Sequence, residues 1–596
     1  MSALGSQGSV SRVRAAYARI READRPEVWI SVRPEPEVLA EAEQIDERVA
    51  AGERLPLAGL VFAVKDNIDV LGLPTTAGCA AYSYPPTQDA TCVARLRAAG
   101  AIAIGKTNLD QFATGLVGTR SPFGPVRNAW DPARISGGSS SGSAVAVALS
   151  EVDFALGTDT AGSGRVPAAL QGIVGVKPTV GSVPTSGVVP ACRSLDCVTV
   201  FAPELALARA VAETMADPAP LPLASSTSST SRVSPALLAS PVLPALPALP
   251  ARPRVAVPVA AQLTDLAEGW SEAFAAAVAR LRSCGVEIVE VDISPLLEAA
   301  TLLYGGAFVA ERYAAVGAFI EKHPDADLDP TVAAIVLAGA APTAADLFRD
   351  RERLERLGAE GLGVFDTCDA LLTPTTTGHP TLAEVAADPV GVNSRLGRYT
   401  NFANLFGLAA LAVPSGLVDG LPFGVMLTGA PHSDTALAGL AARFAAPPVQ
   451  VAVFGAHLRG QPLNRQLVGL GGTFAEDVRT APEYRLFALR TVPTKPGLVR
   501  IGAGASSSAS SSASTSASTG PGTAQGASIA GELWSLPAAG FAELVATLPP
   551  PMAIGPVALA DGRTVPGFLC EPAALDDAED ITPTGGWRVH LAEGRE

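Results

Sequence analysis

Two glycine- and serine-rich clusters, separated by a short apolar run, constrain this chain more than any other feature. The clusters span 135–144 and 157–167, and the apolar run at 144–149 between them is a place where a helix can begin. Glycine lets the backbone approach a ligand closely, and a serine hydroxyl becomes a nucleophile when a base lies near it. Segments of this composition are more often plain loops. Because the surrounding residues are small and apolar rather than solvating, we interpret the stretch as an active site.

The overall charge argues against two classes of partner. The 596 residues include 43 Lys and Arg against 58 Asp and Glu, which gives a net charge of −15. Nucleic acids and anionic membranes both bind basic surfaces, so we expect neither as a partner. One local arginine would still be enough to hold a small anionic substrate.

The cysteine pattern and the N-terminal sequence favour the cytoplasm. The seven cysteines are scattered and include no C-x-x-C, which is typical of a reducing compartment and of a chain without disulfides or a zinc site. The N-terminus lacks the apolar core of a signal peptide, and no run reaches the ~18 apolar residues of a membrane span. We expect a soluble cytoplasmic protein that uses no metal and no cofactor.

Apolar strands alternate with amphipathic helices, which predicts an α/β fold. We expect two helices within 10–51 and further helices at 90–99, 202–215, 266–283, 299–319 and 344–357. We expect strands at 57–64, 101–104, 255–258, 286–291 and 370–373. Thr343 is a plausible N-cap for the last helix, because its hydroxyl can accept a hydrogen bond from the first turn.

The composition changes near residue 449, which predicts a division into a domain at 1–448 and a smaller α+β domain at 449–596. A Ser/Thr-rich and then Leu/Pro/Ala-rich stretch at about 221–251 is expected to be a flexible insertion in the first domain. A Ser/Ala/Thr/Gly tract at about 503–526 is expected to be a disordered loop in the second domain.

Two matches to known motifs lack the structural context that those motifs need. Residues 100–107 match the phosphate-loop pattern G-x-x-x-x-G-K-[ST], which follows a strand and opens a helix, but the interior of this match is itself the expected strand 101–104. Residues 138–142 match the nucleophile elbow G-x-S-x-G, which also needs a preceding strand, and 130–134 is a poor strand. We therefore favour neither nucleotide binding nor Ser140 as the nucleophile.

Lys65, the Gly/Ser cluster around Ser139 and the Asp-Thr-Ala-Gly-Ser sequence that ends at Ser163 together resemble the amidase signature family. The segment 401–416 is similar to that family's late core segment, and the resemblance covers about 45–435. It implies an amidase-signature fold, with helices covering a central mixed β-sheet. It also implies that Ser163 is the nucleophile, that Ser139, on a cis peptide bond, is the relay, and that Lys65 is the base. The implied oxyanion hole consists of the backbone N–H groups of Thr160, Ala161 and Gly162.

The chemistry of these residues agrees with the implied roles. A lone lysine at a strand end is usually solvated, but burial would depress the pKa of Lys65 and make it a base. A neutral lysine acting through Ser139 can deprotonate the nucleophile and then protonate the leaving nitrogen, so no histidine is needed. Consecutive N–H groups can stabilise the oxyanion of an attacked amide.

The segment 303–313 resembles the allophanate hydrolase branch of the family, in which Tyr304 and Arg312 would hold the substrate. Allophanate is a urea that carries a carboxylate, and arginine can bind a carboxylate through two parallel hydrogen bonds. Within the single helix expected at 299–319, the eight positions between the two residues correspond to about 12 Å of rise and leave both on one broad face. The alternative is an amphipathic helix with a surface arginine and a half-buried tyrosine.

The second domain resembles the accessory domain of allophanate hydrolases, through sequences at 453–457, 463–464, 480–486, 531–534 and 567–587. That domain has a gamma-glutamylcyclotransferase-like α+β fold, and in some members it is implicated in decarboxylating the first product. His457 is the candidate site residue there, because histidine can titrate near pH 7. A histidine satisfied in a strand end or turn is an equally good interpretation, and a structural or oligomer-organising role for the domain stays open.

The resemblance therefore implies hydrolysis of allophanate to ammonia and carbon dioxide, as the last stage of urea or s-triazine nitrogen use. The implied partners are the small-molecule substrate, a second copy of the chain in a homodimer, and a functional link to a biotin-dependent urea carboxylase. Two alternatives remain: an amidase for another small amide, and an amidase-like subunit of a transamidation complex.

Overall fold

The computed structural model of the chain divides into two compact units, Met1–Val278 with Glu287–Ala442, and Ala279–Val286 with Arg443–Glu596. The structure describes residues 8–217, 250, 252–445, 449–470, 472–491, 494–501, 526–536 and 538–594. The stretches expected to be flexible at 221–251 and disordered at 503–526 therefore lie outside the described residues, apart from Pro250 and Gly526. Among the described helices, none has the length and apolar character to cross a membrane.

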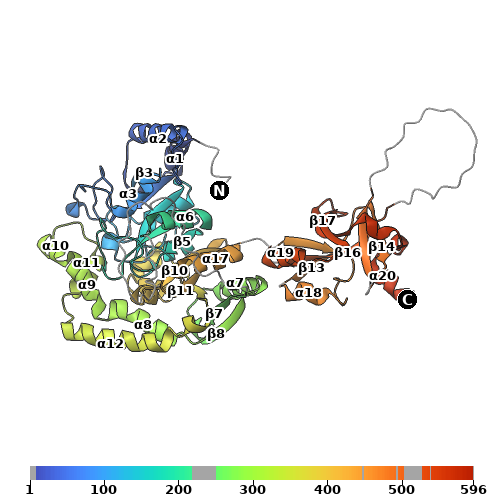
Figure 1. Cartoon of the computed structure of the whole chain (residues 1–596). Helices are drawn as coiled ribbons and strands as arrows, with labels where there is room; N and C mark the ends of the chain where they lie inside the picture. The colour runs from blue at the N-terminus through green and yellow to red at the C-terminus, as the bar shows by residue number, and fades with distance from the viewer. Residues whose placement is uncertain are drawn as a thin grey trace, which may run out of the picture. The chain divides into compact units, whose positions relative to one another are not determined.

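One sheet of eleven strands forms the centre of the first unit, in the order β1-β3-β2-β4-β6-β5-β10-β11-β9-β7-β8. Its strands β3, β5, β10 and β11 are labelled in Figure 1. The central pairs β2–β3 and β2–β4 are parallel, whereas β4–β6 and β10–β11 are antiparallel. The expected α/β class with a mixed sheet is therefore confirmed. The strands are β1 Trp29–Val32, β2 Val61–Lys65, β3 Ile102–Thr107, β4 Phe154–Asp159, β5 Val174–Lys177, β6 Cys197–Ala202, β7 Arg254–Pro258, β8 Glu287–Val291, β9 Ala370–Pro374, β10 Ala409–Val418 and β11 Leu421–Gly429.

Helices surround this sheet, and those expected at 90–99, 202–215, 266–283 and 344–357 begin within four residues of the expected start. They are α1 Ser9–Ala23, α2 Glu35–Ala50, α3 Thr91–Ala98, α4 Ser141–Ala148, α5 Val166–Gln171, α6 Leu205–Met215, α7 Trp270–Ser283, α8 Ser294–Gly305, α9 Ala310–Arg312, α10 Ala318–Lys322, α11 Pro330–Ala338, α12 Ala344–Gly361, α13 Val364–Thr367, α14 Leu382–Ala387, α15 Gly391–Leu396, α16 Asn401–Leu405 and α17 Asp434–Ala445. Thr343 caps α12 through a complete capping box with Asp346, as its position predicted.

The prediction of a single helix at 299–319 is wrong, because the helix is interrupted after α8. Gly306 is extended (φ −109°, ψ −174°), and a 3-10 turn, α9 and a π-helical turn at Tyr313–Gly317 follow before α10. The Asp350 carboxylate accepts a hydrogen bond from Ala307 N at 2.6 Å, and a Cβ on Gly306 would lie 2.7 Å from that same carboxylate. Gly306 therefore lets the Asp350 side chain sit inside the helix break.

The apolar core places the site at one edge of the sheet. Every residue of β2 and β4 is buried, as expected for central strands covered on both faces. Lys65 is the last residue of β2 and Asp159 the last of β4, and these two strands are parallel neighbours. Their carboxyl ends therefore share an edge of the sheet, and α4 packs against both strands. This arrangement brings the first Gly/Ser cluster to the same edge.

The second unit has its own sheets and core. A five-stranded sheet has the order β13-β16-β12-β18-β17, and a three-stranded sheet has the order β15-β14-β19. Its elements are β12 Val449–Val453, α18 Asn464–Gly469, β13 Thr473–Arg479, β14 Tyr484–Leu489, β15 Lys495–Arg500, β16 Ala530–Leu536, α19 Ala538–Ala546, β17 Met552–Ala558, β18 Thr564–Cys570, β19 Glu579–Asp580 and α20 Trp587–Ala592. A cluster that includes Trp534 and Phe568 fills the core of this unit.

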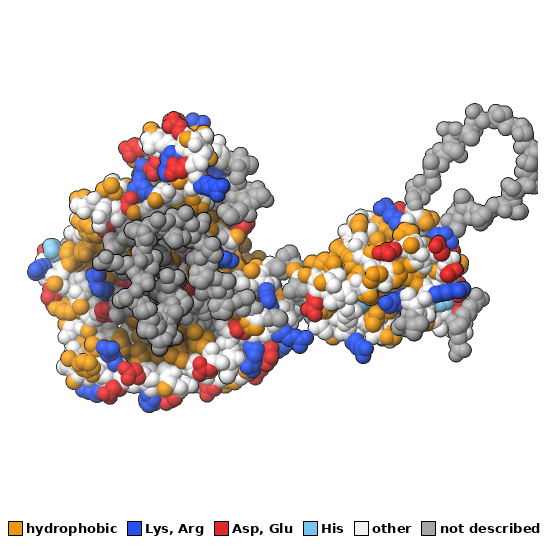
Figure 2. Space-filling view, viewed as in Figure 1, with side chains coloured by type: hydrophobic (Ala, Val, Ile, Leu, Met, Phe, Trp, Pro, Cys, Tyr) orange, Lys and Arg blue, Asp and Glu red, His pale blue; other side chains and the backbone are white. Residues whose placement is uncertain are grey.

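The surface charge agrees with the acidic composition. On the visible face, basic and acidic side chains are interspersed over the described residues, and the basic ones do not gather into a patch (Figure 2). A nucleic-acid backbone binds along a continuous basic stripe, and the described residues on this face show none.

Candidate active site

Lys65 is buried at the end of β2, and its side chain reaches the first Gly/Ser cluster. Its Nζ donates to Ser139 Oγ at 2.7 Å and to Thr158 Oγ1 at 2.8 Å. The lysine is 0% exposed, so the solvated interpretation of this residue does not hold. Thr158, which lies in β4, is a hydrogen-bond partner of Lys65 that carried no signal in the sequence.

Burial lowers the pKa of Lys65 to about 7, although the negative charges of Asp110, Asp196 and Asp159 oppose this effect. Desolvation disfavours the ammonium form, and the shift shows that it outweighs the attraction of the carboxylates. At neutral pH roughly half of such a lysine is uncharged. An uncharged amine hydrogen-bonded to a serine hydroxyl can accept that serine's proton.

Ser139 follows a cis peptide bond from Gly138 and is fully buried. Its carbonyl accepts from Asp110 N at 3.0 Å, and the Asp110 carboxylate accepts three backbone N–H groups, from Val117, Gly118 and Arg120. A Cβ at Gly138 would lie 2.2 Å from Asp110 Oδ2, so glycine is required before the serine. Burial raises the pKa of Asp110, with Arg120 opposing.

Ser163 lies in the loop between β4 and α5, which we call the nucleophile loop (residues 159–165) after the role that the sequence predicts for this serine. Its hydroxyl donates to Gly115 O at 3.3 Å, and the residue is 2% exposed. The structure therefore brings Lys65, Ser139 and Ser163 to one edge of the sheet and links the first two directly. The Ser163 hydroxyl is turned toward Gly115.

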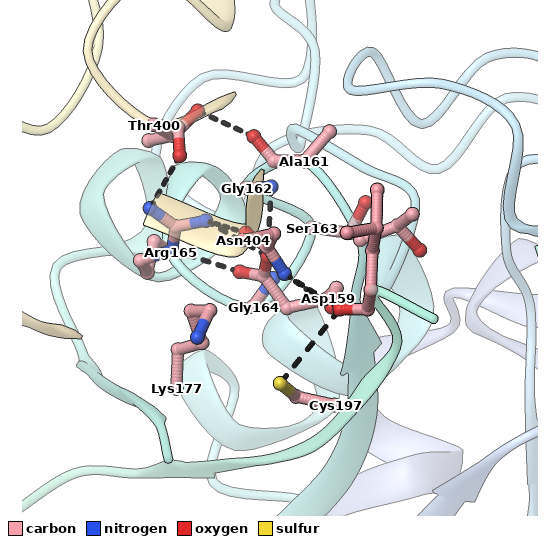
Figure 3. A network of polar contacts seen from close by, with 12 residues as sticks. Asp159, Ala161, Gly162, Ser163, Gly164, Arg165, Lys177, Cys197, Thr400 and Asn404 are labelled. Carbon is pink, nitrogen blue, oxygen red and sulfur yellow. Dashed lines mark hydrogen bonds and ion pairs between the residues drawn. The ribbon is translucent and has the colours of Figure 1, made fainter. Parts of the chain in front are cut away.

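A fully buried ion pair organises the nucleophile loop (Figure 3). Arg165 donates to Asp159 through Nε at 2.9 Å and through Nη2 at 2.8 Å, and both side chains are 0% exposed. The Asp159 carboxylate also accepts from Gly162 N at 2.8 Å and Gly164 N at 2.9 Å. Burial opposes ionisation of Asp159, but Arg165 outweighs it and lowers the pKa of the carboxyl. Sequence reasoning missed this pair, although two charged residues in a loop of small residues were a usable signal.

The three residues expected to form the oxyanion hole differ in their surroundings. The Gly162 N–H is already engaged by Asp159. Thr160 is anchored through its side chain, which donates to Asp196 Oδ1 at 2.5 Å. Ala161 is anchored through its carbonyl, which accepts from Thr400 Oγ1 at 2.6 Å. The N–H groups of Thr160 and Ala161 thus lie between two fixed points of the loop.

Tyr304 and Arg312 contact each other, although they lie on different helices, α8 and α9. Arg312 donates from Nη2 to Tyr304 Oη at 3.0 Å and from Nη1 to Thr114 Oγ1 at 3.1 Å. The arginine is 1% exposed, and among the described residues no carboxylate forms an ion pair with it. The neighbouring Glu311 instead accepts from Ser194 N and Ser194 Oγ, both at 2.7 Å. The surface-arginine alternative is therefore wrong.

Two contacts connect this pair to Ser163 and its loop. Thr114, which accepts from Arg312, directly precedes Gly115, which accepts from Ser163. Leu303, beside Tyr304, belongs to a small buried cluster that also contains Ala161 of the nucleophile loop. A cavity of about 430 Å³ lies beside Tyr304 and is also lined by Asn401.

In the second unit, His457 is buried among neighbours that satisfy it. Its Nε2 lies 3.0 Å from Gln466 Oε1, and its ring stacks on Phe568 with centroids 4.4 Å apart. Burial lowers the pKa of His457, and only the hydrogen bond with Gln466 opposes this, so the ring is neutral near pH 7. It also lines a cavity of about 380 Å³ with Lys495. Neither interpretation of this histidine is eliminated. No cluster of metal-ligating side chains occurs in the described part of either unit.

Two known families match separate parts of the chain. Residues 11–438 match the amidase family, and residues 449–510 and 516–592 match the allophanate hydrolase C-terminal domain. The structure is similar to that of Kluyveromyces lactis allophanate hydrolase, with a TM-score of 0.65, 37% identity, and coverage of 99% of this chain and 98% of that one.

Two relatives of known function match different shares of the chain. The chain is 40% identical to the urea amidolyase of Lachancea kluyveri over 96% of this chain but only 32% of that protein, so it spans about a third of the length of that relative. It is 36% identical to a glutamyl-tRNA(Gln) amidotransferase subunit of Symbiobacterium thermophilum, over 73% of this chain and 93% of that one. The chain therefore belongs to the amidase family.

Proposed function

We propose that this member of the amidase family hydrolyses the terminal amide of allophanate. The observation that carries the proposal is Arg312, a buried guanidinium whose described partners are the hydroxyls of Thr114 and Tyr304. A buried cation without an anion is costly, and a substrate carboxylate would stabilise it through two parallel hydrogen bonds. Because Arg312 and Ser163 bind the consecutive residues Thr114 and Gly115, one small molecule can reach both. The likeness to an allophanate hydrolase along nearly the whole chain supports the same substrate.

In the proposed acylation step, neutral Lys65 takes the proton of Ser139 while Ser139 takes the proton of Ser163. The Ser163 oxygen attacks the terminal carbamoyl carbon, and the N–H groups of Thr160 and Ala161 bind the developing oxyanion. The proton then returns through Ser139 to the leaving nitrogen, and ammonia departs. This step requires Ser163 to turn from Gly115 toward Ser139.

Water then attacks the acyl-enzyme by the same proton path and releases an N-carboxylated product. That product loses carbon dioxide, either spontaneously or with help from the second unit, and the overall yield is two ammonia and two carbon dioxide. His457 is the proposed residue for such help, because it lines a cavity that also contains the cation Lys495. His457→Gln tests it: ammonia counted per allophanate should fall from two toward one while the first release keeps its rate.

Three further proposals concern the setting of the enzyme. The chain acts as a homodimer in the cytoplasm, where the seven free cysteines of the described residues would stay reduced. It is functionally linked to a biotin-dependent urea carboxylase, which the urea amidolyase relatives support by their name and greater length. It requires no metal or organic cofactor.

The test is ammonia release by the purified chain from allophanate, biuret, malonamide and simple aliphatic amides. We expect turnover of allophanate by the wild type and none by a folded Ser163→Ala variant. Preference for an uncharged amide would favour an amidase of another specificity. Turnover only in the presence of other subunits would favour the transamidation role that the amidotransferase relatives have in their name.

A further inference from the structure

The segment 401–416, which resembles a late core segment of the family, ends in β10 of the sheet, but its first residues and the preceding Thr400 lie against the nucleophile loop. We infer that Thr400, just before α16, is a positioning residue for the reaction and fixes the Ala161 peptide group between the oxyanion donors and the nucleophile. The inference rests on the proposed roles of Thr160, Ala161 and Ser163, and it adds a residue far from them in the sequence.

Thr400 contacts the nucleophile loop through both its side chain and its backbone. Its hydroxyl donates to Ala161 O at 2.6 Å, and its carbonyl accepts from Arg165 Nη1 at 2.9 Å (Figure 3). Thr400 is fully buried, so no water competes for these hydrogen bonds. The loop is thus bound on both sides of Ser163, two residues before it and two residues after it.

A second donor reaches the same carbonyl. With its amide nitrogen turned toward the loop, Asn401 donates to Ala161 O at 2.7 Å. Asn404, one turn further along α16, accepts from Arg165 Nη2 at 2.8 Å and donates to Asp159 O at 2.9 Å. The end of the loop that follows β4 is therefore tied to α16 at two backbone carbonyls, those of Asp159 and Ala161.

The opposite anchor of the donor pair is Asp196, which accepts from the Thr160 hydroxyl. The N–H groups of Thr160 and Ala161 lie between this anchor and the Thr400–Ala161 hydrogen bond. Oxyanion donors act only when they are preorganised, because their value depends on not having to reorient during the reaction. Removing one anchor leaves both N–H groups in the protein but frees their direction.

Gly162 and Thr400 pack so closely that a larger group on either residue would push the loop away. A Cβ on Gly162 would lie 2.4 Å from Thr400 Oγ1, so the loop can approach the threonine only because residue 162 is glycine. A methyl group in place of the hydroxyl cannot approach a carbonyl oxygen closer than about 3.3 Å. Thr400→Val should therefore push Ala161 away as well as remove its hydrogen bond.

The test compares Thr400→Val and Thr400→Ser with Thr428→Val. Thr428 is equally buried, in β11, but its hydroxyl has no hydrogen-bond partner among the described residues, so it controls for the loss of a buried hydroxyl. We expect Thr400→Val to lower kcat for allophanate by about 10- to 100-fold, part of the 10²–10³ that losing a whole donor costs. KM should change less than about threefold, Thr400→Ser should recover most of the rate, and Thr428→Val should match the wild type.

A second readout does not depend on the substrate. A fluorophosphonate phosphonylates a reactive serine with loss of fluoride and places an oxygen in the oxyanion hole, so the labelling rate of Ser163, followed by mass spectrometry, should fall in parallel with kcat. If the wild type is labelled but does not hydrolyse allophanate, the proposed substrate is wrong, and the labelling rates still test the role of Thr400. Equal rates in the wild type and Thr400→Val, an equal loss in Thr428→Val, or a wild-type Ser163 that resists labelling would overturn the inference. Should Thr400→Val fail to fold, Thr400→Ala is measured by the same criteria.

Discussion

The depressed pKa of Lys65 predicts how both activity and stability depend on pH. In the proposed mechanism Lys65 acts as a base only when it is neutral, and burial lowers its pKa from 10.5 to about 7. At pH 6 about a tenth of the lysine is neutral and at pH 5 about a hundredth, whereas a lysine of ordinary pKa would be neutral in only about one molecule in 3,000 at pH 7. We therefore expect kcat/KM for ammonia release to rise tenfold per pH unit at acid pH and to level off above about pH 7.5.

The same shift has an energetic consequence that Lys65→Met measures. A drop from 10.5 to about 7 corresponds to about 5 kcal/mol that the folded state loses by keeping the amine neutral. Between these two pKa values the unfolded chain binds a proton that the folded chain does not, so the destabilisation is fully present at and below pH 7 and disappears as the pH rises to about 10.5. Replacement by methionine should abolish turnover and yet stabilise the fold at pH 7.

The net gain in stability is smaller than the full amount of about 5 kcal/mol, because the hydroxyls of Ser139 and Thr158 lose their hydrogen-bond partner, which costs about 1–3 kcal/mol. We expect Lys65→Met to be more stable than the wild type by roughly 2–4 kcal/mol at pH 7, with the difference shrinking toward pH 10. Urea unfolding at pH 7, 8.5 and 10 gives this difference. A pH-independent difference, or a wild-type activity profile with its midpoint above pH 9, would refute a buried neutral lysine.

Three further predictions concern the substrate clamp, the buried ion pair and the helix break. Arg312→Lys should raise KM for allophanate by about 10- to 100-fold with a smaller change in kcat, because one ammonium cannot form two parallel hydrogen bonds; steady-state kinetics that show an unchanged KM would contradict the clamp. Arg165→Met should leave the Asp159 carboxylate buried without its cation and destabilise the fold by about 3–5 kcal/mol in urea unfolding, and a loss below about 1 kcal/mol would mean that the hydrogen bonds from Arg165 to Asp159 are replaceable. Gly306→Ala should raise KM, since its Cβ would meet Asp350 at 2.7 Å, whereas Gly305→Ala, whose Cβ meets nothing within 4 Å, should behave as wild type; equal effects of the two would exclude the helix break as the cause.

Local patterns in the sequence were enough for much of the fold. Alternating strands and helices predicted the α/β class, the resemblance to the amidase signature family implied the mixed sheet, and Thr343 predicted the start of α12. The strands β1, β4, β5, β6, β10 and β11 were not predicted. Their neighbours in the sheet stabilise them more than their own composition does: β1, for example, has four residues and is paired with β3. The helix break after Gly305 was missed because it depends on Asp350, which lies on another helix.

The candidate site also contains both residues that the sequence indicated and residues that it did not. Ser139 and Ser163 lie in stretches whose glycine content already indicated close backbone approach, so the sequence pointed to them. Thr158, Asp110 and Asp196, which surround Lys65 or its neighbours, are ordinary residues in sequence and acquire their importance only from burial. The expected use of the Gly162 N–H overlooked the Asp159 carboxylate three residues earlier, which is within reach only because the loop turns back after β4.

The nucleophile loop supplies the proposed reacting groups but not the side chains that hold them in place, which explains why it needs residues from so far along the chain. A loop of small residues can bring N–H groups close to a substrate, but its own side chains are too short to fix their direction. Arg165 supplies one long side chain, and it in turn is bound by Thr400 O and Asn404 Oδ1. The small residues that permit the chemistry therefore require an external support, and α16 provides it through hydrogen bonds that join residues more than two hundred positions apart. On this view, substitutions in α16 that break these hydrogen bonds should lower the rate of acylation, because they free the direction of the oxyanion donors.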